Sequence, residues 1–120
     1  MREGSIAVVG ASSDKSKYWH KIFADLKAAG FDVCCVNPKT EADPQNNIYK
    51  DWASLPRKPQ TIIIVVRPEL TAEITAYAAE NGVKELWFQP GTYDETSAKT
   101  AKEAGISVHN ACFMVQKGIW

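Results

Sequence analysis

The sequence predicts an α/β fold built on a doubly wound parallel sheet, and three observations support this. Short β-branched runs recur along the chain and are apolar throughout, as in strands covered on both faces. Patterns typical of amphipathic helices lie between these runs. Three of the helical stretches end at a glycine shortly before the next apolar run. Right-handed crossovers then place the strands in one sheet, for which we predict five strands in the order 3-2-1-4-5.

The boundaries of the elements follow from these patterns. The predicted strands are Ile6–Val9, Val33–Val36, Thr61–Val66, Glu85–Phe88 and a weaker Ile106–His109. Apolar residues spaced three or four apart predict helices over about Lys17–Ala29, Glu69–Asn81 and Glu95–Ala104. Residues 40–59 contain three prolines, so we expect a long loop there, with a short helical turn at Trp52–Leu55. Residues 112–120 are expected to form a short helix or a tail.

Length and composition narrow the class of protein. The 120 residues suit one domain, so we expect residues 1–120 to form a single unit. The 14 Lys and Arg balance the 14 Asp and Glu and form no basic run, which argues against a nucleic-acid partner. The apolar run Ile62–Val66 is too short to span a membrane, and the first residues lack a signal-peptide core. Three cysteines, two of them adjacent, indicate a reduced cytoplasmic protein.

Small residues and hydroxyls follow the first strand, at Gly10-Ala11-Ser12-Ser13. A strand-to-helix turn presents free backbone N–H groups and the positive end of the helix dipole to a phosphate. The second and third glycines of the dinucleotide fingerprint are absent, so Ser12 and Ser13 would have to contribute hydroxyls to a pyrophosphate site. The alternative is a turn whose small residues serve only the backbone.

The second strand ends in Asn37-Pro38-Lys39, where NAD-binding proteins usually place an acidic residue that holds the ribose hydroxyls. Asn37 can hydrogen-bond to a ribose or a base edge, and Lys39 can neutralise a phosphate. This combination favours a ligand with a phosphorylated ribose, meaning coenzyme A or NADP, over NAD. The alternative is a proline-led loop with a solvated lysine.

Two further tripeptides end strands on the same rim as Gly10, namely Val66-Arg67-Pro68 and Gln89-Pro90-Gly91. Arg67 is a candidate phosphate contact, and Pro68 suits the first position of a helix. We expect the amide of Gln89 to lie where the ligand chain would leave the sheet, at a switch point that we place above strands 1 and 4.

Cys112 follows the fifth strand on this rim, and we predict that its thiol, rather than the core thiols of Cys34 and Cys35, forms a mixed disulfide with CoA under mild oxidation. A buried apolar cysteine is the alternative. His20 and His109 have no Cys or His at ligand spacing, and no nucleophile-elbow motif occurs. We therefore predict neither a metal site nor catalytic residues, and leave enzymatic activity open.

Taken in order, these residues resemble CoA-binding domain proteins, which are small, single-domain and Rossmann-like, and the CoA-binding domain of the succinyl-CoA synthetase alpha subunit. The resemblance runs from Ser5 to about Cys112 and rests on Ile6–Ser12, Tyr18, Ala29-Gly30, Val36–Lys39, Arg67–Glu69, Trp87–Gly91 and Ala104-Gly105. It implies a bound 3′-phospho-ADP moiety. By this resemblance, the pyrophosphate would contact Gly10, Ala11 and Ser12, and the adenosine end would lie against Asn37, Pro38 and Lys39. The adenine would lie against Val66 and Pro68, and the pantetheine chain of the CoA would pass Gln89 and Gly91.

We therefore predict a protein that binds CoA or an acyl-CoA and has no catalytic machinery of its own. One alternative is an oxidoreductase or regulator that uses NADP on the same rim. Another is a protein-interaction module in which Trp19, standing where related proteins commonly have glycine, blocks the site. The acyl group stays open, as does a homo-oligomeric state.

Overall fold

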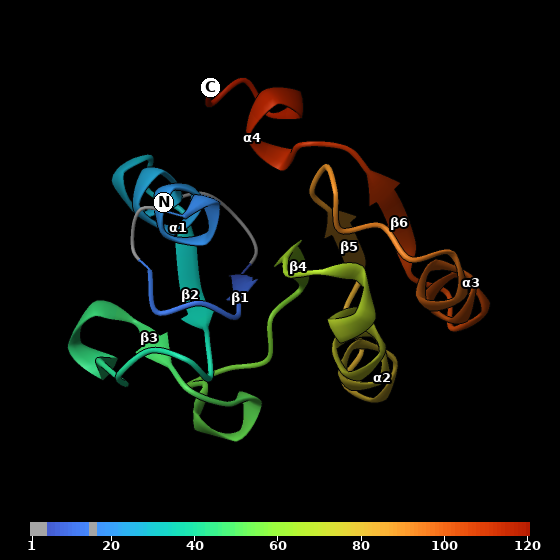
Figure 1. Ribbon diagram of the computed structural model, residues 1–120, viewed down its shortest axis with the longest axis horizontal. Coiled ribbons are helices and arrows are strands. Elements are labelled where there is room, and N and C mark those ends of the chain that lie inside the picture. The colour runs from blue at the N-terminus through green and yellow to red at the C-terminus, as the bar shows by residue number, and fades with distance from the viewer. Residues whose placement is uncertain (1–4, 15–16) are drawn as a thin grey trace.

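The computed structural model describes residues 5–14 and 17–120 and shows one parallel sheet (Figure 1). Its strands are β1 (Ser5–Gly10), β2 (Asp32–Val36), β3 (Ile48–Tyr49), β4 (Thr61–Val65), β5 (Glu85–Phe88) and β6 (Ser107–Asn110). They lie in the order β3-β2-β1-β4-β5-β6, and every pairing is parallel. The predicted α/β class with a doubly wound parallel sheet is confirmed.

The number of strands is a correction, since the sheet has six strands where five were predicted. The additional strand, β3, has two residues and lies in the segment that was predicted to be a loop. Two residues are too few to show a periodic pattern, so no strand signal is visible there in the sequence. Numbered along the chain with β3 included, the strands have the order 3-2-1-4-5-6. The predicted order places Thr61–Val66 at the edge beside the second strand and Glu85–Phe88 beside the first, and this placement is wrong: β3 takes the edge position, β4 (Thr61–Val65) pairs with β1, and β5 pairs with β4. The switch point therefore falls between β1 and β4.

The helices cover both faces of the sheet. They are α1 (Tyr18–Ala28), α2 (Thr71–Glu80), α3 (Glu95–Glu103) and α4 (Phe113–Gln116), with 3₁₀ turns η1 (Pro44–Asn46), η2 (Trp52–Ser54) and η3 (Pro68–Leu70). In Figure 1, α1 and α4 lie on one side of the sheet and α2 and α3 on the other. The predicted helices are confirmed to within about two residues. The predicted helix at Glu69 begins as the turn η3 before it becomes α2.

The turns from helix to strand confirm the glycine pattern. Gly30, Gly82 and Gly105 follow α1, α2 and α3, and their φ angles of 86°, 69° and 84° lie in the left-handed region. A side chain is strained there, so glycine ends each helix at a defined point and directs the chain into the next strand.

Two apolar cores result, one on each face of the sheet. The core under α1 and α4 contains Trp19, Leu26 and Met114, all buried. Cys34 and Cys35 are both buried within β2 and, as neighbours in a strand, point to opposite faces, as predicted. Among the described residues, no helix is long and apolar enough to cross a membrane.

Candidate functional site

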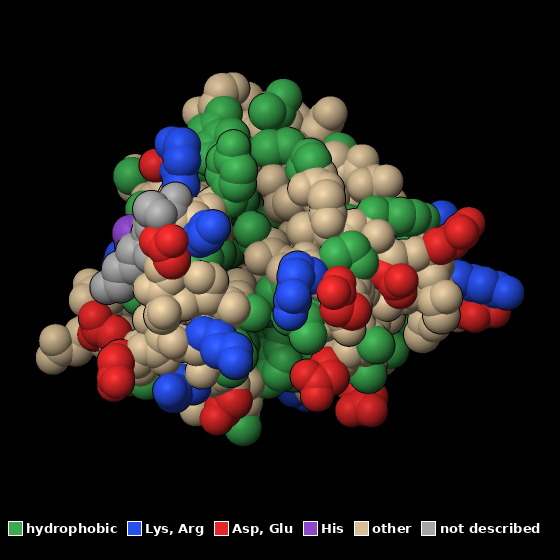
Figure 2. Space-filling model, viewed as in Figure 1, with side chains coloured by type: hydrophobic (Ala, Val, Ile, Leu, Met, Phe, Trp, Pro, Cys, Tyr) green, Lys and Arg blue, Asp and Glu red, His purple; other side chains and the backbone are tan. Residues whose placement is uncertain are grey.

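The carboxyl ends of β2, β1 and β4 border two adjoining cavities at the switch point. The larger cavity has a volume of about 580 Å³ and the smaller about 300 Å³. Ala11, Lys39, Val66 and Leu70 line both of them. Figure 2 looks onto this edge of the sheet and shows a central hollow with Lys and Arg side chains on either side. The rim predicted to carry the site therefore contains a hollow that a ligand could occupy.

The first wall of the site is the loop between β1 and α1. An added Cβ on Gly10 would lie 2.7 Å from both Cβ and Cγ of Trp19, which is only 1% exposed. Gly10 is not among the residues with a left-handed φ. The glycine is thus required because α1 packs closely against the end of β1, and not because of its backbone angles.

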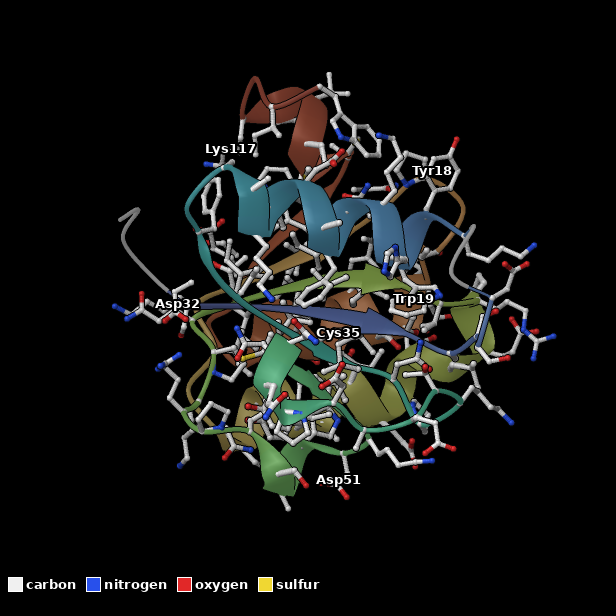
Figure 3. The ribbon with its side chains drawn as sticks, turned by 90° about the vertical axis from the view of Figure 1, so that its left-hand side faces the viewer. Tyr18, Trp19, Asp32, Cys35, Asp51 and Lys117 are labelled. Atoms are coloured by element: carbon white, nitrogen blue, oxygen red, sulfur yellow. The ribbon has the colours of Figure 1, made fainter. Side chains whose placement is uncertain are left out.

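Trp19 holds this loop in place. Its indole Nε1 donates a hydrogen bond to the carbonyl oxygen of Asp14, at 3.1 Å. Figure 3 shows Trp19 near the start of α1, directed toward the sheet, while Tyr18 points away from it. The indole lines the larger cavity from its position in the core. Trp19 therefore forms a wall of the site and leaves the cavity beside it open.

Asn37 has a different place from the one expected. Its side chain is fully buried, its Nδ2 donates to the carbonyl oxygen of Ser12 at 2.9 Å, and its Oδ1 accepts from the backbone N–H of Lys39 at 3.0 Å. Asn37 does not line the cavities described above. Both of its polar groups are already paired, so its side chain joins the two loops and is not directed at a ribose or base edge.

The charged side chains that line the larger cavity are positive. Lys17, Lys39 and Arg67 line it, and within the described part of the chain none of them forms an ion pair. The α1 N-cap, Lys17, makes no capping hydrogen bond through its side chain. Cations and a helix N-terminus beside one cavity make a suitable environment for phosphate groups.

The predicted site residues divide into two groups. Nine line the two cavities or a third, adjoining one of about 490 Å³, namely Gly10, Ala11, Ser12, Ser13, Pro38, Lys39, Val66, Arg67 and Gly91. Asn37, Pro68, Gln89 and Cys112 do not.

Pro68, Gln89 and Cys112 have structural roles outside the cavities. Pro68 begins η3. The buried side chain of Gln89 donates through Nε2 to the Cys112 sulfur at 3.3 Å and accepts through Oε1 from the Phe113 N–H at 2.7 Å. The Gln89 amide therefore fastens the start of α4 and is not free at the exit that we expected for the ligand chain.

Several lining residues were not anticipated from the sequence. They are Lys17, Lys50, Trp52 and Leu70. Lys17 precedes a helix directly after the small-residue turn, which is a usable signal for an anion site. Lys50 and Trp52 belong to the segment predicted as a loop, where the two-residue strand that positions them is too short to give a signal in the sequence.

The three cysteines differ in burial. Burial raises the pKa of Cys34, and burial followed by the neighbouring Cys34 raises the pKa of Cys35 to about 12. Their thiolate fractions are therefore small at pH 8, whereas Cys112 is half-buried. We expect iodoacetamide at pH 8 to label Cys112 first, as mapped by peptide mass spectrometry, and Cys112→Ser to remove the fast adduct. Equally fast labelling of Cys34 or Cys35 would contradict the burial described here.

The fold and site define a doubly wound α/β domain with cation-lined cavities at the switch point of its sheet. Residues 4–118 match the CoA binding domain family, and the chain belongs to that family. It is 30% identical, over 82% of its length, to the alpha subunit of acetate–CoA ligase (ADP-forming) II of Pyrococcus furiosus. The chain spans only about a fifth of that subunit, 22% of its length.

Solved structures share the fold of this chain. A hypothetical protein from Pyrococcus horikoshii OT3 superposes with a TM-score of 0.84 at 34% identity, covering 94% of this chain and 80% of the other. A conserved hypothetical protein from Pyrococcus furiosus gives 0.80 at 35% identity, covering 93% and 97%. The apo dinucleotide-forming acetyl-coenzyme A synthetase 1 of Ca. Korarchaeum cryptofilum gives 0.71 at 25% identity, covering 87% of this chain and 25% of that one.

Proposed function

We propose that this chain binds CoA or an acyl-CoA at the carboxyl edge of its sheet. The observation that carries the proposal is the position of Lys39, which lines all three adjoining cavities in a chain of the CoA binding domain family. CoA carries phosphates at two separate points, the pyrophosphate and the ribose phosphate, and therefore needs cations on more than one wall of its site. Besides Lys39, the cations Lys17 and Arg67 line the larger cavity.

The parts of the ligand can be assigned by chemistry. The pyrophosphate suits the loop from Gly10 to Ser13, where α1 begins. The smaller cavity has apolar walls that include Pro38 and Val66, and suits the adenine. The larger cavity continues along Gly91, which suits the pantetheine chain. The side chain of Asn37 connects two of these walls through its hydrogen bonds to Ser12 and Lys39.

Two observations weigh on the alternative functions. The family match favours CoA over NADP as the ligand. Of the three tryptophans that could form the exposed aromatic surface of a protein-interaction module, Trp19 and Trp87 are buried, whereas Trp120 is 42% exposed and lies beside the exposed ring of Tyr18. The ligase relative is a much longer chain, and we assign no ligase reaction to this one. The three free cysteines suit the reducing cytoplasm that we propose as its location.

The direct test is titration calorimetry of the protein with CoA, with NADP and NAD as comparisons. We expect CoA to bind and NADP to bind more weakly. Absence of heat with CoA at about millimolar concentration, which corresponds to a binding free energy near −4 kcal/mol, would sink the proposal.

Lys39 provides the sharper prediction. If it contacts the ribose phosphate, CoA should bind about tenfold more tightly than dephospho-CoA, because a charge-assisted contact contributes roughly 1.5–3 kcal/mol. Lys39→Ala should remove most of that difference, as measured by calorimetry with both ligands. Lys102→Ala, on α3 away from the cavities, is the matched control and should leave both affinities unchanged. Equal affinities of the wild type for the two ligands would show that Lys39 is only solvated.

A further inference from the structure

A second lysine stands beside Lys39 because of the way β2 and β3 pair. The backbone N–H of Asn37 donates to the carbonyl oxygen of Tyr49, at 2.9 Å. Lys50 directly follows Tyr49, and Lys39 lies two residues beyond Asn37. The two lysines thus leave the ends of adjacent parallel strands at the same edge. Both line the smaller cavity and also the third cavity of about 490 Å³.

The two cavities that these lysines share differ in chemistry. The walls of the smaller one include the apolar side chains of Val9, Val36 and Ile74, together with Trp52. The third is lined mainly by polar and charged residues, which are Ser13, Lys39, Thr40, Glu41, Asp43 and Lys50, with Ala42 and Ile48. A flat base suits the first cavity, and a phosphate monoester on the attached ribose would then reach the second, between the two lysines.

Several carboxylates lie near the two lysines and could repel a phosphate there. Asp43 accepts a hydrogen bond from Asn46 Nδ2 at 2.8 Å, and Asp51 accepts from the backbone N–H and hydroxyl of Ser54 at 2.9 and 2.7 Å. These two acids are therefore engaged in the turns η1 and η2. Glu41 and Glu73 also line these cavities, so four carboxylates surround the two lysines, and attraction of a phosphate rests on direct contact with the two ammonium groups and not on a net positive charge. Within residues 5–14 and 17–120, neither Lys39 nor Lys50 forms an ion pair.

We propose that Lys50 is a specificity-determining residue that, together with Lys39, binds the ribose phosphate of the ligand. The inference rests on the proposed CoA function and adds to it a second cation from β3. A phosphorylated ribose is common to CoA and NADP, so the two sources are separated by the choice of ligand.

The experiment measures dissociation constants by calorimetry for the wild type, Lys50→Ala, Lys50→Arg and the control Lys102→Ala. The ligand pairs are CoA against dephospho-CoA, adenosine 3′,5′-bisphosphate against AMP, and NADP against NAD. We expect Lys50→Ala to weaken CoA about fivefold to tenfold and dephospho-CoA by less than about twofold, because an exposed charge contact is partly screened. Lys50→Arg should retain most of the preference, and the bisphosphate should show the same loss as CoA.

The outcomes separate this inference from the proposed function. If the wild type binds CoA but Lys50→Ala weakens CoA and dephospho-CoA equally, the role of Lys50 is overturned while CoA binding stands. If Lys50→Ala weakens only NADP, the ribose phosphate that Lys50 binds is that of NADP and the CoA assignment is wrong. If no form of CoA binds the wild type, the proposed function falls, and the inference falls with it.

Discussion

Gly10→Val is expected to destabilise the fold by about 3 kcal/mol and to abolish CoA binding, since overpacking a close contact typically costs roughly 1–3 kcal/mol and occasionally more. The cause is the 2.7 Å approach of an added Cβ to Cβ and Cγ of the buried Trp19, atoms whose positions are fixed by the backbone of α1. Gly10→Ala should cost about 1–2 kcal/mol by the same contact. Urea unfolding of the ligand-free protein measures both losses.

Because the unfolding is measured without ligand, it separates a role of Gly10 in packing from a role in phosphate binding. If the glycine served only to admit a phosphate, both variants would keep the stability of the wild type and lose binding alone. Ser13→Val is the matched control, because Ser13 is exposed in the same loop and also gains a branched side chain. It should unfold at nearly the same urea concentration as the wild type.

Asn37→Asp should be the second large effect, with a loss of about 2–4 kcal/mol in stability. The substitution replaces the Nδ2 donor with a carboxylate oxygen that faces the Ser12 carbonyl at a fully buried position. The loop with Ser12 and the loop with Lys39 would then lose their connection. We expect CoA affinity to fall by about tenfold or more, because the walls of the site lose their relative position.

Asn81→Asp is the matched control for this prediction. Asn81 Nδ2 also donates to a backbone carbonyl, that of Tyr77 at 2.8 Å, but it does so at the end of α2, away from the cavities. This variant should lose less stability and keep the CoA affinity of the wild type. Unfolding and calorimetry of both variants, below their unfolding transitions, give the comparison. An Asn37→Asp protein with unchanged affinity would mean that Asn37 does not position the loops.

The class of fold, and the edge of the sheet at which the candidate site lies, could be predicted from the amino-acid sequence. Continuous apolar runs and helix-ending glycines such as Gly30 are local signals, and crossover handedness converts them into one doubly wound sheet. Residues at the carboxyl ends of parallel strands meet at one edge, so their order along the chain is enough to group Ser12, Lys39 and Arg67.

The roles of individual residues at that edge depend on tertiary packing and could not be predicted in this way. Gly10 is constrained by Trp19, nine residues further along the chain, and Asn37 and Gln89 use their hydrogen bonds on Ser12 and Phe113. The strand β3, which carries the chain to Lys50, consists of two residues that pair with β2. Such contacts depend on which segments the packing brings together, and a side chain has no fixed partner until the sheet has formed. A pattern in the sequence can therefore indicate the edge of the sheet that carries the candidate site, while only packing shows which polar groups remain free to bind a ligand.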